Sequence, residues 1–223
     1  MLPMLLAAAL STQAQIMKGD TLLGGNISFS SGTGSSNDPT NPDHEHQSYF
    51  SFSPSVGKAV KDNLLAGFDL LYAHSSSSSN DGSTGYSEKI NTYGAGVFLR
   101  WYKYLGANFS IFGQGRLGGT YSDQRDLNSV SSSSNADQKT YNINLGFYPG
   151  LAYAISNRFQ VEMGLQNLVA VGYSHTKQTL TDANDPGTRI SKNNSFSAST
   201  GLGGSLQGFV IGFKVLLGPV HHS

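Results

Sequence analysis

Residues 141–153, YNINLGFYPGLAY, alternate almost perfectly between apolar and small or polar side chains. The apolar face would carry Tyr141, Ile143, Leu145, Phe147, Pro149, Leu151 and Tyr153. A repeat of two residues is the repeat of a β-strand, whose successive side chains point to opposite faces of a sheet. The segment therefore predicts a strand that separates an apolar environment from a polar one.

The same alternation recurs along the rest of the chain. The other expected strands lie near residues 21–31, 47–57, 64–74, 88–101, 108–121 and 159–173, with a last strand ending at Leu217. Short links near 58–63, 102–107 and 155–158 alternate with long segments at 32–46, 75–87, 122–138 and 174–194 that are rich in Ser, Asn, Asp, Thr and Gly. Long loops would thus gather at one end, which predicts an all-β fold, a closed antiparallel up-and-down transmembrane β-barrel of about eight strands.

The composition excludes several other classes of protein. Hydrophobic residues make up 38% of the 223 residues, and no mature segment offers the roughly 20 continuous apolar residues of a membrane-spanning helix. Lys plus Arg and Asp plus Glu number 14 each, so no basic excess favours a nucleic-acid partner. Cysteine is absent, which removes disulfides and thiolate chemistry. We expect no cofactor and no metal.

The first residues have the features of a segment that directs export from the cytoplasm. Leu2 to Leu10 form a short apolar run, and small or polar residues follow up to Gln15. This order is typical of a secretory signal peptide. We predict a cleaved signal segment over residues 1–14 and one β-barrel domain over 15–223.

Aromatic residues at the strand ends favour a barrel in a membrane over a soluble one. Amphipathic rings gather at the two interfaces of a bilayer, and the presumed inward rows are rich in Gly, Ser, Asn and Gln. The expected belt near the long loops contains Phe29, Phe50, Tyr72, Tyr121, Tyr141 and Tyr173. The expected belt near the short links contains Trp101, Tyr102, Phe109, Tyr153 and Phe159.

The predicted inward face collects charged residues. These are Asp69, Arg100, Arg116, Glu162 and Lys214. Buried charges require partners, so we expect ion pairs across the lumen. A structural plug is the favoured interpretation over an ion pathway, because about eight strands leave an interior mostly filled by side chains.

On these features the chain resembles the small eight-stranded outer-membrane β-barrel proteins of OmpA/OmpX type. The resemblance rests on the signal-like start, the GGNISFS opening strand, the SFSPSVGKAVKDNLLAGFDL hairpin and the closing GFVIGFKVLLG. It implies a monomer in the outer membrane of a Gram-negative-type envelope, surrounded by outer-membrane lipid. An extracellular ligand or surface partner is also expected.

Two short motifs give weak evidence for a binding site. Gly113, Gly115 and Gly118 spell G-x-G-x-x-G, but a dinucleotide site needs a helix after the motif, so glycines within a strand are favoured. Residues 44–46, His-Glu-His, could ligate an adventitious metal in the first polar segment, although a solvated loop is favoured.

Three functions remain open. A non-enzymatic barrel with a structural, adhesion or surface-recognition role through long extracellular loops is favoured. A narrow, porin-like pore or transporter for small solutes is the second. The third is an enzyme that modifies lipid A, on the hint of His74, Ser76 and Glu88 near the outer rim.

Overall fold

The structure is a computed structural model that describes residues 16–36, 43–80, 85–106, 108–128, 135–165, 168–181, 188–200 and 209–218. The predicted signal segment lies outside the described residues. Ten strands make up the described part: β1 (Thr21–Ser36), β2 (Asp43–Lys61), β3 (Leu64–Asn80), β4 (Gly85–Tyr104), β5 (Phe109–Asn128), β6 (Asn135–Ala154), β7 (Phe159–Leu165), β8 (Val169–Thr181), β9 (Thr188–Thr200) and β10 (Phe209–Leu217). No helix in the described ranges is long and apolar enough to cross a membrane.

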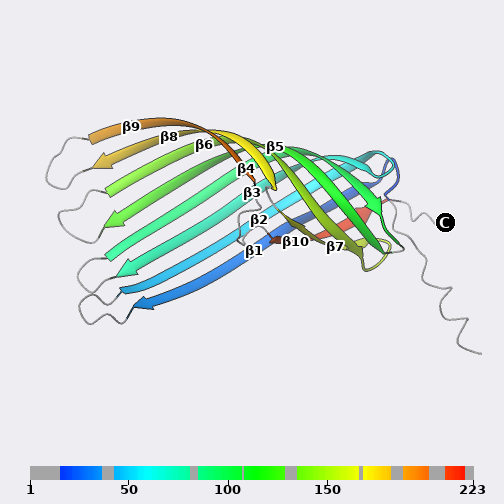
Figure 1. Ribbon diagram of the computed structural model, residues 1–223, viewed down its shortest axis with the longest axis horizontal. Helices are drawn as coiled ribbons and strands as arrows, with labels where there is room; N and C mark the ends of the chain where they lie inside the picture. Colours follow the sequence, from blue (N-terminus) through cyan, green and yellow to red (C-terminus); the bar gives the residue numbers. More distant parts are fainter. Residues whose placement is uncertain are drawn as a thin grey trace, which may run out of the picture.

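All strands form one antiparallel sheet that curls into a barrel (Figure 1). β1 to β6 pair in sequence order, and β6 then pairs with β7 near one end and with β8 near the other. β7 and β8 thus follow one course around the barrel, and β9 and β10 follow the next. Ten strands on eight courses give the predicted eight-stranded antiparallel barrel.

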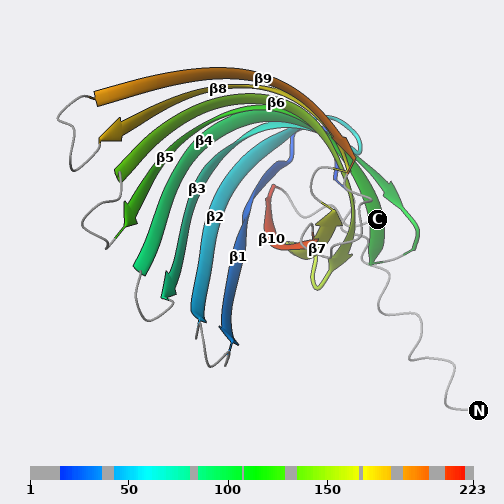
Figure 2. The ribbon, with the colours of Figure 1, turned by 60° about the vertical axis from the view of Figure 1, so that its left-hand side comes forward.

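The ring closes through β10. This strand pairs with β7 on one side and with Thr21 to Asn26 of β1 on the other, which joins the last course to the first. We call the half of the barrel that contains β1 beyond Asn26 the outer half. In this half, the described residues of β1 from Ile27 onward pair with β2, and those of β9 pair with β8. Figure 2 shows β9 and the outer part of β1 as the two edges of this half.

The polar segments expected as long loops are mostly strand. β3 runs to Asn80 and β5 runs to Asn128, so these strands continue six and seven residues past the predicted ends at 74 and 121. The prediction of four long loops was wrong because it relied on apolar alternation. Outside a membrane both faces of a strand meet water, so the alternation vanishes while the backbone ladder continues.

The opposite end of the barrel holds its apolar core. The core cluster consists of Ile16, Leu22, Ala59, Leu65, Tyr102, Phe112, Ala152 and Leu216. The segment before β1 completes this end, since the Ile16 carbonyl accepts a hydrogen bond from the Asn63 amide at 3.0 Å. Asn63 adopts φ 63° in the tight β2–β3 link, a conformation that asparagine tolerates.

Candidate functional site: a polar lumen on a packed floor

A buried ion pair lies next to the apolar core cluster, on its side toward the middle of the barrel. We use "above" for the direction toward the end of the barrel at which β1 ends, and "below" for the direction toward the core cluster. Arg100 Nη1 donates to both Glu162 oxygens at 2.7 Å, and the two side chains are 8% and 5% exposed. Tyr102 Oη donates to Glu162 Oε1 at 2.9 Å, while Arg100 Nε donates to Gln114 Oε1 at 2.7 Å. Four side chains from β4, β5 and β7 therefore satisfy one another across the lumen. We call these four residues the floor network.

Aromatic rings hold the arginine of the floor network in place. The Arg100 guanidinium carbon lies 4.4 Å from the centroid of the Phe112 ring and 5.7 Å from that of Phe98. Stacking on aromatic faces suits guanidinium because the ion is planar and more weakly hydrated than an ammonium. The floor network is thus packed from below by apolar groups and leaves little room beside the charges.

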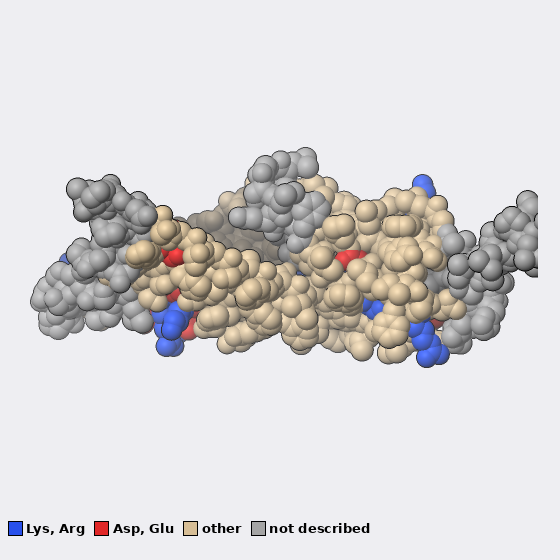
Figure 3. Space-filling view, turned by 90° about the horizontal axis from the view of Figure 1, so that it is seen from below, with Lys and Arg blue, Asp and Glu red and all other residues tan. Residues whose placement is uncertain are grey.

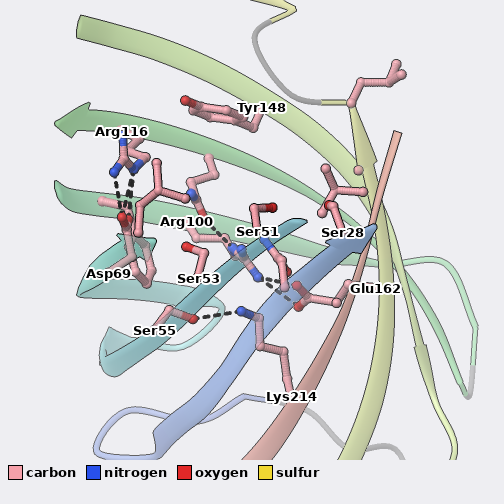
Figure 4. Close-up of a pocket in the computed structure, with 18 of the residues that line it drawn as sticks. Ser28, Ser51, Ser53, Ser55, Asp69, Arg100, Arg116, Tyr148, Glu162 and Lys214 are labelled. Atoms are coloured by element: carbon pink, nitrogen blue, oxygen red, sulfur yellow. Dashed lines mark hydrogen bonds and ion pairs between the residues drawn. The ribbon is translucent and has the colours of Figure 1, made fainter. Parts of the chain in front are cut away.

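A second ion pair lies farther out. Arg116 Nη2 and Asp69 Oδ1 are 2.6 Å apart, and Arg116 Nε donates to Asp69 Oδ2 at 2.9 Å, which is a bidentate pair. Gly96 makes room for it, because a Cβ at that position would lie 2.6 Å from Arg116 Nη2. Figure 4 shows this pair and the Arg100–Glu162 pair at separate places in the same lumen.

Lys214 is the fifth charged residue of the lumen. It is 3% exposed, and its Nζ donates to Ser55 Oγ at 2.8 Å rather than to a carboxylate (Figure 4). The structure thus brings the five sequence-predicted lumen residues together as two ion pairs and one lysine bonded to a hydroxyl. A cavity of about 750 Å³ extends above them, with serines from β1 and β2 and Tyr148 from β6 on its wall.

The outer surface of the barrel has the opposite character. Val97, Leu117, Ile143 and Leu145 point outward midway along their strands and are 51–60% exposed. Figure 3 shows Lys and Arg mainly toward the two ends of the face that it draws, with mostly uncharged surface between them. Charged groups inside and apolar groups outside are the arrangement that a bilayer requires of a barrel.

The protein is a transmembrane β-barrel of the outer-membrane type. Rings at both ends of its apolar band agree with this. Near the outer end, Tyr121 and Tyr141 lie side by side with ring centroids 5.0 Å apart, and near the other end Phe109 lies 4.8 Å from Tyr153. Outward-facing Trp101 is 52% exposed at the latter end.

Of the other rings assigned to the belts, Phe29, Phe50, Tyr72, Phe159 and Tyr173 are 38–74% exposed. Tyr102 is an exception, because it is only 1% exposed and belongs to the floor network. Its place in the belt was wrong, since it lies two residues from Arg100 and therefore on the inward face of β4. Strict parity along β4 would have found it.

Three solved outer-membrane structures show what the barrel is similar to in overall shape. OprG from Pseudomonas aeruginosa is 15% identical with a TM-score of 0.49, and covers 92% of this chain and 99% of its own. A major outer membrane protein from Thermus thermophilus is 10% identical, with a TM-score of 0.42 and 89% and 99% covered. The ferric yersiniabactin uptake receptor FyuA from Yersinia pestis is 14% identical, with a TM-score of 0.40 and 74% and 26% covered. No protein-family model and no curated protein sequence matches the chain.

The weaker candidates are not assembled into sites in the described residues. His74 lies opposite Asn91 and its Nδ1 is 2.8 Å from the Asn91 side-chain oxygen. Strand parity puts Glu88 on the other face, where the Tyr86 hydroxyl donates to it at 3.0 Å. The same parity separates Glu45 from the two histidines beside it, and the described residues contain no cluster of three metal-ligating side chains.

Proposed function

We propose that this protein is a non-enzymatic, non-conducting outer-membrane barrel that presents its outer strands to a surface partner. The observation that carries the proposal is the packed floor of the lumen. The side chains of the floor network bond to one another across the lumen, and the apolar core cluster packs against their inner side. A small eight-stranded interior has room for side chains or for one small ligand, but not for an open water column.

The outer strands favour a surface role. β4 extends eight residues beyond Tyr93 to Gly85, and β5 extends seven residues beyond Tyr121 to Asn128. At about 3.3 Å per residue, paired sheet continues roughly 23–26 Å along the strands past the outer rings. This extension is paired sheet in place of the loops expected from the sequence, so we assign recognition to the sheet itself.

Planar-bilayer recording tests the conduction part of the proposal. Purified barrel should give no reproducible conductance steps under conditions in which a general porin does. Sustained, uniform channels would overturn the proposal and favour the narrow transporter, the second candidate, to which the cavity of about 750 Å³ gives specific support.

Cysteine labelling tests the presentation part, because the native chain has no cysteine. Thr33, exposed on the outer part of β1, and Ser156, exposed in the β6–β7 link, provide matched positions. In intact cells, a maleimide on a polyethylene glycol chain too large for porins should label Thr33→Cys. It should label Ser156→Cys only after the outer membrane is permeabilised. The reverse pattern would refute the assignment of the outer end.

A further inference from the structure

Three lysines stand side by side on the outside of the barrel. Lys139 of β6 is the cross-strand partner of Lys177 of β8, and Lys177 is the partner of Lys192 of β9. All three are exposed and share the outward face with Tyr141, Tyr173 and Phe196. We call Lys139, Lys177 and Lys192 the lysine ladder.

The lysine ladder is an arrangement that a folded sheet alone does not favour. Side chains directly opposite each other on neighbouring strands have Cβ atoms only about 4.5–5.5 Å apart, and like charges there are destabilising. Asp123 faces Lys139 from β5. The cross-strand partners of Lys177 and Lys192 among the described residues are only each other and Lys139. The ladder therefore has an excess of positive charge that an external anion would relieve.

The height of the ladder relative to the outer rings identifies the anion. Lys139 is two residues outward from Tyr141, and Lys177 is four residues outward from Tyr173, which is about 7 Å and 13 Å along the strand. Aromatic rings mark the boundary between acyl chains and headgroups. The ladder thus lies at the level of lipid headgroups.

Hydrogen bonds between the outer aromatic rings and the lysine ladder fit the same boundary between acyl chains and headgroups. The Tyr173 hydroxyl donates to Asn194 Oδ1 at 3.0 Å, and His175 Nδ1 lies 2.7 Å from the same oxygen. Tyr173 therefore keeps its ring among apolar neighbours and turns its hydroxyl toward the ladder, as an interfacial tyrosine does. The surface changes from apolar through hydrogen-bonding to cationic within one short stretch of sheet.

We propose that the lysine ladder binds the phosphates of a phosphorylated lipid in the outer leaflet of the membrane. Side-chain ammonium groups on flexible stems act as point charges for phosphate, and three of them in a row span more than one phosphate group. The outward faces of β1 to β3 at this height carry Ser, Thr and His instead, whereas Lys89 of β4 and Arg125 of β5 face outward beside the ladder, so the cationic surface is confined to one side of the barrel. The inference rests on the membrane placement and not on the proposed recognition role.

The test compares two triple variants in phosphatidylcholine nanodiscs that contain either bisphosphorylated lipid A or its dephosphorylated form. Lys139→Gln, Lys177→Gln and Lys192→Gln together remove the ladder. Lys58→Gln, Lys61→Gln and Lys103→Gln, exposed residues at the opposite end, remove the same charge elsewhere. Native mass spectrometry of the released barrel measures retained lipid, and thermal unfolding measures stabilisation.

Wild type and the control triple variant should retain bisphosphorylated lipid A, and the ladder variant should bind it roughly 100-fold more weakly, or about 5-fold for each lysine. In discs with dephosphorylated lipid A, where the only lipid phosphates belong to zwitterionic phosphatidylcholine, the ladder variant should be at least as stable as wild type, because the repulsion between the lysines has been removed. A reversal of the order of stability between the two disc types is the specific signature.

Two outcomes would overturn the proposal. One is equal retention of bisphosphorylated lipid A by wild type and the ladder variant. The other is ladder-dependent binding of a soluble polyphosphate without any ladder-dependent binding of the lipid, which would assign the ladder to a soluble polyanion.

Discussion

Loss of Glu162 should strongly destabilise the barrel. Glu162 accepts three hydrogen bonds in the floor network, and its side chain is only 5% exposed. In the Glu162→Ala variant, Arg100, whose side chain is 8% exposed, would keep only Gln114 and Tyr102 as hydrogen-bond partners among the described residues. Removal of one partner of a buried pair typically costs about 3–5 kcal/mol, and we expect a loss of that size in the free energy of unfolding.

Trp101 provides the assay. It is the only tryptophan, it faces outward, and its emission should shift when it moves from lipid to water. Urea titration of the barrel in lipid vesicles, followed by this emission and by heat-modifiability on gels, gives the free energy of unfolding. Asp123→Ala is the matched control, since Asp123 pairs at 3.7 Å with Arg125 and the two side chains are 24% and 70% exposed, far more than those of Glu162 and Arg100. A long, partly exposed pair of this kind contributes about 0–1 kcal/mol.

A double variant separates the effect of leaving one buried charge without its partner from the effect of lost side-chain packing. Arg100→Met with Glu162→Leu replaces both charges by apolar groups of similar size, and such replacements are often neutral. The double variant should therefore be more stable than Glu162→Ala alone. A loss below about 1 kcal/mol in Glu162→Ala, or a double variant no more stable than Glu162→Ala, would refute the reasoning that the two charges depend on each other.

Three other predictions concern separate parts of the barrel. Arg116→Met should cost about 3–5 kcal/mol because it leaves Asp69 buried without its bidentate partner, and the same urea titration measures the loss. Trp101 fluorescence should be quenched by lipids with brominated acyl chains, and an unquenched signal would contradict its outward position in the membrane. Outside the bilayer, burial and the hydrogen bond to Glu88 raise the pKa of Tyr86 to about 12. The unfolded chain releases this phenol proton above about pH 10, so the contribution to stability is full below pH 10 and is lost as pH rises toward 12. Tyr86→Phe should remove that part of the pH dependence, measured as the difference from wild type.

The membrane-spanning part of the barrel could be predicted from the amino-acid sequence alone. In a bilayer a strand must show an apolar face to lipid, and alternation such as that of residues 141–153 survives in the primary structure. The five charged lumen residues followed from the same parity, and the structure places all five inside. The ion-pair partners of these residues could not be predicted in this way. Alternation shows which face of the sheet a side chain occupies, but not how far along the barrel axis it lies. Which arginine meets which carboxylate depends on the stagger between strands that are far apart in the chain.

The ends of the strands and the pairing of their outer parts became visible only in the three-dimensional structure. Beyond the bilayer both faces are solvated, so residues 75–80 and 122–128 carry no strand pattern although they pair as strands. The lysine ladder has the same origin, since its three members lie 38 and 15 residues apart in the chain and become neighbours only through the registers of β6, β8 and β9. Local patterns record the environment of a strand, whereas contacts between distant strands depend on how the whole sheet closes.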